Sequence, residues 1–130
     1  PVRKLGLEKN VLFTGYRSGE DYRTALQTFD VKIFLVPGSD GTCRAVREAL
    51  ASGIPVISSK RGILPSLIED GKTGRVIDDT PDNIAKVLID IGSSPEKLAE
   101  MKKAARINAE KRFSYENYVS TIIDLWERSL

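Results

Sequence analysis

The feature that most constrains the fold is a helix-length segment, residues 37–55, enclosed by two short apolar runs. Ile-Phe-Leu-Val fills positions 33–36, and Val56 and Ile57 follow on the other side. Short apolar runs with one helix between them are typical of buried parallel strands in a βαβ unit. The segment begins Pro-Gly-Ser-Asp-Gly, which is loop chemistry. In open α/β sheets such a loop lies at the carboxyl ends of the strands, where ligands bind.

Two acidic residues flank the start of the predicted helix, Asp40 before it and Glu48 on its second turn. Glycines let the backbone approach a ligand, and the first turn of a helix offers free N–H groups at its positive end. The two carboxylates can therefore hold hydroxyl groups on either side of a phosphate bound there. Simpler interpretations compete: Glu48 as a solvated helix residue, and Asp40 as an N-cap or turn residue.

The rest of the chain continues the alternation of strands and helices. Strands are predicted at residues 11–14, 32–36, 54–58 and 75–77. Helices are predicted at about residues 19–28, 42–52, 65–69, 81–91 and 95–112, and from Ser114 onward. We therefore predict an α/β fold, a doubly wound, Rossmann-like, mostly parallel sheet with helices on both faces and a helical C-terminal tail.

Local signals set several boundaries within this pattern. Ser18 and Thr80 are predicted N-caps, and Gly53 is predicted to end the central helix as a C′ residue. The helix after Pro81 is expected to turn four apolar residues inward: Ile84, Val87, Leu88 and Ile91. An apolar stripe on the last helix is expected in the core or at a seam with another domain: Tyr115, Tyr118, Ile122, Leu125 and Trp126.

Composition bounds the classes of function. The 130 residues suffice for one domain, and 41% apolar residues can form its core. A net charge of +2 is too small to favour nucleic acid as a partner. With no histidine and one cysteine, the chain lacks the usual general base, the usual zinc ligands and an intrachain disulfide. Because it opens Pro-Val-Arg-Lys, which is neither a signal peptide nor an initiator methionine, we expect one domain, residues 1–130, from a longer protein. The single cysteine favours a reducing compartment, so a cytoplasmic location is expected.

Three motifs in order give the chain a family resemblance. Asp40 is followed, after seven residues, by Glu-Ala-Leu-Ala-Ser-Gly-Ile-Pro-Val at 48–56. Residues 62–74 read Gly-Ile-Leu-Pro-Ser-Leu-Ile-Glu-Asp-Gly-Lys-Thr-Gly, and residues 13–16 read Phe-Thr-Gly-Tyr. Over residues 11–78 this pattern resembles the carboxyl-terminal half of the group 1 glycosyltransferases, retaining enzymes with the two-domain GT-B fold.

The resemblance implies that a nucleotide-sugar donor binds on this half and that its sugar is transferred with retention. By position, Glu48 is expected to bind the ribose and Asp40 the transferred sugar, which makes both catalytic candidates. Tyr16, the residue after Gly15, is expected beside the base. Further donor-binding candidates lie in the same two loops: Gly15, Arg17, Gly38, Ser39, Gly41, Thr42, Cys43 and Arg44. No metal or separate cofactor is expected, since cationic side chains and the helix end offset the diphosphate charge.

Some residues depart from the family pattern. Asp40 replaces the usual glutamate, Ser66 replaces a common glutamate, and Lys60 and Arg61 stand where glycine is frequent. The family's diphosphate-gripping Arg and Lys have no equivalent here, so this chain alone is expected to bind donor weakly and transfer little. The acceptor, a glycan, a lipid-linked glycan or a small molecule, is expected on another domain, with peripheral membrane contact left open.

Two other functions stay open at this level. A nucleotide-sugar epimerase can share the fold, although it needs acid and base groups and this half has no histidine. A non-catalytic signalling or interaction module is also doubly wound, but Asp30 precedes the second strand rather than following it, which fits a receiver-like site poorly. Cys43 is expected to be a small buried thiol rather than a nucleophile.

Overall fold

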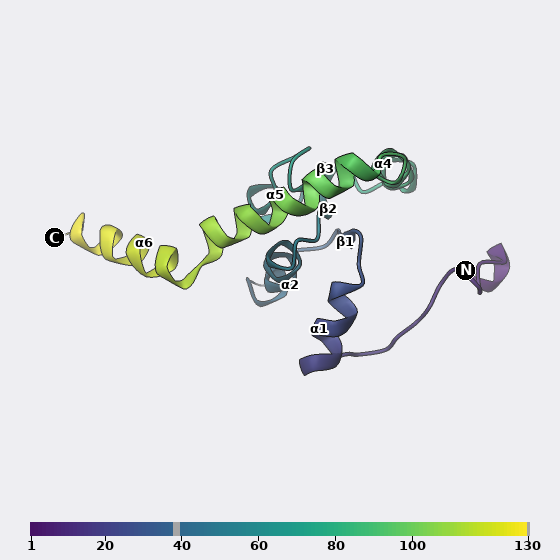
Figure 1. The fold of residues 1–130 in the computed structure, drawn as a ribbon, viewed down its shortest axis with the longest axis horizontal. Helices are drawn as coiled ribbons and strands as arrows, with labels where there is room; N and C mark the ends of the chain where they lie inside the picture. The colour runs from purple at the N-terminus through teal and green to yellow at the C-terminus, as the bar shows by residue number, and fades with distance from the viewer. Residues whose placement is uncertain (38–39, 130) are drawn as a thin grey trace.

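The computed structural model describes residues 1–37 and 40–129, and for residues 40–42 the backbone alone. This part of the chain holds three strands: β1 (Lys32–Phe34), β2 (Val56–Ser59) and β3 (Gly74–Ile77). Its helices are η1 (Arg3–Leu5), α1 (Gly19–Gln27), α2 (Asp40–Ala51), α3 (Leu64–Leu67), α4 (Pro81–Gly92), α5 (Pro95–Phe113) and α6 (Tyr115–Glu127). Figure 1 shows α6 and the N-terminal segment projecting from opposite sides of this body.

The three strands form one parallel sheet in the order β1-β2-β3. Ile57 in the middle strand lies opposite Ile33 of β1 and Arg75 of β3. Because α2 connects β1 to the parallel strand β2, the predicted βαβ unit is confirmed. The predicted α/β, Rossmann-like class is confirmed with it.

Helices pack on both faces of the sheet. Successive side chains of a strand point to opposite faces, so neighbouring residues of β2 enter different clusters. Val56 belongs to a buried cluster with residues of α2, α3 and the second half of α5. Ile57, the next residue along β2, belongs to a second cluster with residues of α4 and the first half of α5. The long helix α5 therefore ties the two faces together, and it makes its most extensive contact with α2.

Two glycines are required by the backbone. A Cβ atom on Gly74 would lie 2.0 Å from the carbonyl oxygen of Val56, so only glycine allows β2 and β3 to pair here. Gly53 has a φ of 72°, the left-handed conformation that ends helices, and follows directly after Ser52 at the end of α2. The prediction that Gly53 ends this helix is confirmed.

The predicted strand at residues 11–14 is wrong. These residues have no regular secondary structure, and Leu12 and Phe13 are 85% and 80% exposed. An extended segment becomes a strand only when its N–H and C=O groups pair with a neighbour. Within the described residues, β1 and β2 pair only with one another and with β3, so the segment at 11–14 has no strand beside it.

Several finer expectations also need correction. Helix α2 begins at Asp40 rather than at residue 42, and Leu88 of α4 is 40% exposed rather than inward. Ser18 stands at the N-cap of α1 but its side chain makes no capping hydrogen bond, whereas the Thr80 hydroxyl accepts one from the Asn83 N–H as predicted. The apolar stripe of α6 is exposed, so it is not part of the core described here.

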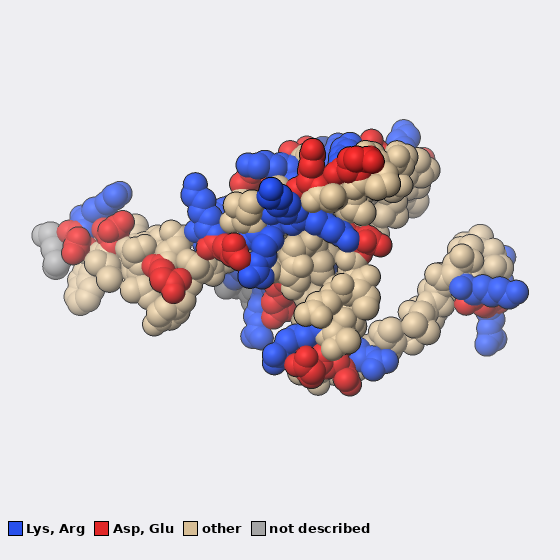
Figure 2. Space-filling model, in the orientation of Figure 1, with Lys and Arg blue, Asp and Glu red and all other residues tan. Residues whose placement is uncertain are grey.

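The surface charges are mixed in sign. Figure 2 shows Lys and Arg interspersed with Asp and Glu on the drawn face, with no single basic patch. Some of these charges pair across elements; the Lys102 ammonium of α5, for example, lies 2.6 Å from the Asp30 carboxylate. Among the described residues, none of the helices combines the length and the apolar character that crossing a membrane requires.

Candidate functional site

A hollow of about 700 Å³ lies between α1 and α2 at the end of β1. We call it the Glu48 hollow. Its lining comes from the loop before α1, from α1, from β1 and from α2: Tyr16, Arg17, Ser18, Gly19, Tyr22, Phe34, Arg44, Ala45 and Glu48. Because Phe34 is the last residue of β1, the hollow opens at the carboxyl end of a parallel strand, where the sequence predicts ligand binding.

Glu48 is held in this hollow by two donors. The Tyr22 hydroxyl donates to Glu48 Oε2 at 3.0 Å, and Arg44 Nε donates to Oε1 at 2.9 Å. Arg44 lies one helical turn before Glu48, whereas Tyr22 reaches across from α1. The Glu48 side chain is 34% exposed, so the carboxylate is fixed but still open to the hollow. Glu48 therefore has two hydrogen-bond partners and is partly solvated.

Lys32 lies behind this pair. As the first residue of β1 it is half-buried, and its ammonium donates to the carbonyl oxygen of Ala45 at 3.1 Å. The same nitrogen lies 3.5 Å from the Tyr22 hydroxyl and 5.8 Å from the centre of the Tyr22 ring. Burial lowers the pKa of Lys32, and the nearby Glu48 charge partly opposes this shift. Three elements, α1, β1 and α2, thus meet through polar groups.

Tyr22 is the residue that joins Lys32 to Glu48. Burial and its hydrogen bond to Glu48 raise the pKa of the Tyr22 hydroxyl, which favours the neutral, proton-donating form. Sequence reasoning singled out neither Tyr22 nor Lys32 and so missed both roles. A signal was present for Lys32, because a charged residue opens an otherwise apolar run, Lys-Ile-Phe-Leu-Val.

The predicted residues of the first loop lie beside this network. Tyr16 is 94% exposed and, with Arg17, lines the Glu48 hollow. The Arg17 guanidinium lies 4.0 Å from the Asp21 carboxylate, an exposed pair on the first turn of α1. Gly15 has a φ of 66° and stands just before Tyr16, outside the lining. Tyr16, Arg17, Arg44 and Glu48 are therefore brought together, as the sequence predicts.

The predicted residues of the second loop are described only in part. Gly38 and Ser39 lie outside the described residues, as do the side chains of Asp40 and Thr42, and Gly41 is described by its backbone alone. The backbone of residues 40–43 forms the start of α2. The Cys43 side chain is fully buried in the core, which confirms the prediction of a small buried thiol. It does not line the Glu48 hollow, so a donor contact stays open only through its backbone N–H.

Lys60 and Arg61, which depart from the family pattern, are ion-paired on the surface. The Lys60 ammonium lies 2.8 Å from the Asp78 carboxylate, and the Arg61 guanidinium lies 2.7 Å from that of Asp79. Neither residue lines the Glu48 hollow. Their charges are compensated locally, and both remain surface residues here.

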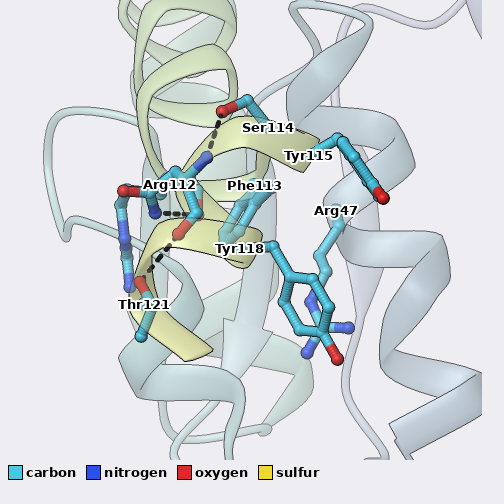
Figure 3. A pocket seen from close by; sticks show the side chains of 8 residues that line it. Arg47, Arg112, Phe113, Ser114, Tyr115, Tyr118 and Thr121 are labelled. Carbon is cyan, nitrogen blue, oxygen red and sulfur yellow. Dashed lines mark hydrogen bonds between the residues drawn. The ribbon is translucent and has the colours of Figure 1, made fainter. Parts of the chain in front are cut away.

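A second hollow, of about 640 Å³, lies on the other side of α2, where α5 bends into α6 (Figure 3). We call it the Arg112 hollow. The guanidinium carbons of Arg47 and Arg112 lie 6.0 and 5.3 Å from the centre of the Phe113 ring. Arg112 also donates to the carbonyl oxygen of Ser66 at 2.8 Å, which ties α5 to α3. The α6 residues in Figure 3 include Tyr118 and Thr121.

The sequence matches known proteins over most of its length. The family model described as glycosyl transferases group 1 matches residues 1–108. Spore coat protein SA of Bacillus subtilis is 30% identical over 122 residues, which are 92% of this chain and 32% of that protein. D-inositol 3-phosphate glycosyltransferase of Corynebacterium kroppenstedtii is 29% identical over 99% of this chain and 28% of its own length. The chain thus spans about a third of the relatives it matches.

Solved structures share the fold. Anabaena Alr3699/HepE, crystallised in complex with UDP and glucose, is 26% identical and superposes with a TM-score of 0.82 over 99% of this chain and 35% of its own. The C-terminal domain of LpcC, a group 1 family protein of Francisella tularensis, is 21% identical with a TM-score of 0.74. That match covers 88% of this chain and 59% of the other, and at this identity it supports the fold alone.

Proposed function

Because the chain belongs to the group 1 glycosyltransferases, we propose that it is the donor-binding domain of a two-domain, retaining glycosyltransferase. The substrate is a nucleoside diphosphate sugar, and the acceptor is a glycan, a lipid-linked glycan or a small molecule bound by another domain. The bond between the anomeric carbon and the diphosphate breaks, and the acceptor oxygen forms a new bond on the same face. The nucleoside diphosphate and the acceptor proton leave.

The observation that carries this proposal is the environment of the Glu48 carboxylate, meaning its hydrogen bonds and its exposure. Its carboxylate is fixed by Tyr22 and Arg44 at the wall of a hollow, at the carboxyl end of β1, and remains partly exposed. A carboxylate accepts about four hydrogen bonds, and side chains in the described part of the chain take two of these positions. The open positions suit the hydroxyl groups of a ribose. In this proposal Glu48 binds the ribose of the donor.

The start of α2 is assigned to the diphosphate and the sugar. The first N–H groups of a helix have no partner within the helix and lie at the positive end of its dipole. The N–H groups of Gly41, Thr42 and Cys43 are in this position, and Asp40, at the first residue of α2, is assigned to the hydroxyls of the transferred sugar. Together with the cations of the hollow, these groups stabilise the charge on the leaving diphosphate, with no metal.

The relatives support a nucleotide sugar as the donor. Anabaena Alr3699/HepE has been crystallised both with UDP and with UDP-glucose, and its likeness to this chain covers 99% of the residues. The family match favours a transferase over a signalling module. A cytoplasmic location also belongs to the proposal, and the experiment below identifies the base, the donor sugar and the acceptor.

The test uses the full-length protein. UDP, GDP and ADP are titrated first, followed by their sugars in the presence of candidate acceptors, with anomeric configuration read by NMR. We expect one nucleoside diphosphate to bind, and we expect Glu48→Gln to weaken that binding, to remove its preference for ribose and to reduce the transfer sharply. Normal turnover by a folded Glu48→Gln variant would exclude the assigned role. Conversion of a nucleotide sugar to its epimer without any acceptor would favour the epimerase instead.

A further inference from the structure

We infer that Tyr22 is a positioning residue for Glu48 and that Lys32 supports it, so that both favour a donor carrying a ribose cis-diol. The inference rests on the proposed function and adds to it two residues outside all three sequence motifs. It starts from the contacts of these side chains: Tyr22 to Glu48 at 3.0 Å, and Lys32 to Tyr22 at 3.5 Å.

The direction of the hydrogen bonds follows from the chemistry of the groups. An ammonium group has three donors and no acceptor, so the Tyr22 oxygen accepts from Lys32. A carboxylate has acceptors only, so the single phenolic hydrogen of Tyr22 is donated to Glu48. The chain of donors runs from Lys32 through Tyr22 to Glu48, and each bond polarises the next.

This arrangement leaves a defined acceptor pattern on Glu48. Among donors in the described residues, Oε1 receives one hydrogen bond, from Arg44, and Oε2 receives one, from Tyr22. With about two acceptor positions on each oxygen, these donors leave one position on Oε1 and one on Oε2. Two open positions on neighbouring oxygens match two hydroxyls on neighbouring carbons, as in the 2′,3′-diol of ribose.

Of the two donors to Glu48, Tyr22 constrains it more. Arg44 lies on the same helix and its side chain is 77% exposed, so it can move away from Glu48 at little cost in free energy. Tyr22 reaches Glu48 from α1, is half-buried, and is backed by Lys32, which is itself held by the Ala45 carbonyl of α2. A side chain that is fixed before the ligand arrives loses less conformational entropy on binding. Removing the Tyr22 hydroxyl is therefore expected to affect diol binding.

The experiment compares ribose with 2′-deoxyribose. Using the full-length protein and the tightest binder among UDP, GDP and ADP, the Kd is measured for that nucleotide and its 2′-deoxy form. We expect Tyr22→Phe to reduce the preference for ribose by about tenfold, the equivalent of one hydrogen bond. Lys32→Met should reduce it in the same direction by less. Tyr118→Phe, which removes a hydroxyl from the Arg112 hollow, is the matched control and should keep the preference.

A double variant separates positioning from a general loss of structure. If Tyr22 acts through Glu48, then Tyr22→Phe adds no further loss of preference in a Glu48→Gln background. A purely structural role would weaken ribose and deoxyribose forms equally and leave their ratio unchanged. If Tyr22→Phe fails to fold, the same ratio measured on Lys32→Met decides the question.

The outcomes distinguish this inference from the proposed function. A ribose preference that depends on Glu48 but is unchanged in both Tyr22→Phe and Lys32→Met overturns the inference and leaves the proposed function standing. Absence of binding by all three nucleotides, or binding that is indifferent to Glu48→Gln, overturns the proposed function and the inference with it.

Discussion

The two hollows beside α2 differ in what their charged side chains contact. Arg47 and Glu48 are neighbours in sequence, but consecutive residues of a helix point about 100° apart, so one lines the Arg112 hollow and the other the Glu48 hollow. In the Arg112 hollow, two guanidinium groups stack on Phe113 and one donates to a backbone carbonyl. In the Glu48 hollow, a carboxylate receives two donors from the described side chains, which leave acceptor positions open.

The difference shows how a binding site can be told from a structural contact. The bond from Arg112 to the Ser66 carbonyl connects α5 to α3, and the stacking on Phe113 covers an aromatic ring. These contacts are complete without a ligand. The contacts of Glu48 orient the carboxylate and leave part of its hydrogen-bonding capacity unused. We therefore propose donor binding in the Glu48 hollow and a structural role for the contacts of the Arg112 hollow.

The largest effect is expected from a substitution in the sheet, which should unfold the domain and with it both hollows. In Gly74→Ala the new Cβ would lie 2.0 Å from the Val56 carbonyl oxygen, so β2 and β3 must separate. We expect a loss of more than about 3 kcal/mol, enough to prevent folding, as read by circular dichroism. Gly92→Ala is the control, because nothing lies within 4 Å of its Cβ position. A Gly74→Ala variant as stable as Gly92→Ala would contradict the sheet geometry.

The second-largest effect is expected from a substitution that changes the Glu48 hollow and leaves the Arg112 hollow intact. Glu48→Gln keeps the shape of the side chain but removes the charge that holds two donors. We expect transfer by the full-length protein to fall by about 100-fold or more with little change in thermal stability. Tyr118→Phe should retain near-normal transfer. Equal losses in the two variants would remove the distinction between the hollows.

A smaller effect is expected on the other side of α2. Phe113→Leu removes the ring on which Arg47 and Arg112 stack. The free energy of unfolding should fall by about 1–2 kcal/mol, measured as a lower urea midpoint. The Kd of the nucleoside diphosphate should stay within a factor of about two of wild type. A large change in Kd with an unchanged urea midpoint would instead place ligand binding in the Arg112 hollow.

The smallest effect concerns an ion pair remote from both hollows. The Lys97 ammonium, 2.6 Å away, lowers the pKa of Asp90 by hydrogen bonding and charge. Because the folded-state pKa lies below the unfolded one, this stabilisation is present at neutral pH and is lost as pH falls below about 4. In Lys97→Met the free energy of unfolding should fall slightly less steeply as the pH is lowered, and nucleotide binding should be unchanged. An unaltered acid profile would show that the pair contributes nothing.

Sequence reasoning succeeded where local chemistry determines the structure. Gly53 and Thr80 were assigned from short patterns, and the helix carrying Glu48 follows from its position between two apolar runs. It failed at residues 11–14, whose pattern suits a strand but which lack a neighbouring strand in the described part of the chain. Pairing is a tertiary property that a single segment does not encode.

The same limit applies to the candidate site. Glu48 and Arg44 are one helical turn apart, so their contact could be anticipated from spacing. Tyr22 meets Glu48, and Lys32 meets Tyr22, only because α1 and β1 fold against α2; Tyr22 and Glu48 are 26 residues apart in sequence. Their chemistry is visible in the sequence, but their proximity is not.

The most direct test is a crystal structure of the full-length protein with the nucleoside diphosphate that binds best. Our account predicts the ribose hydroxyls within hydrogen-bonding distance of both Glu48 oxygens, and the diphosphate at the first turn of α2. A ligand found against Phe113 in the Arg112 hollow, or at the amino ends of the strands, would contradict it.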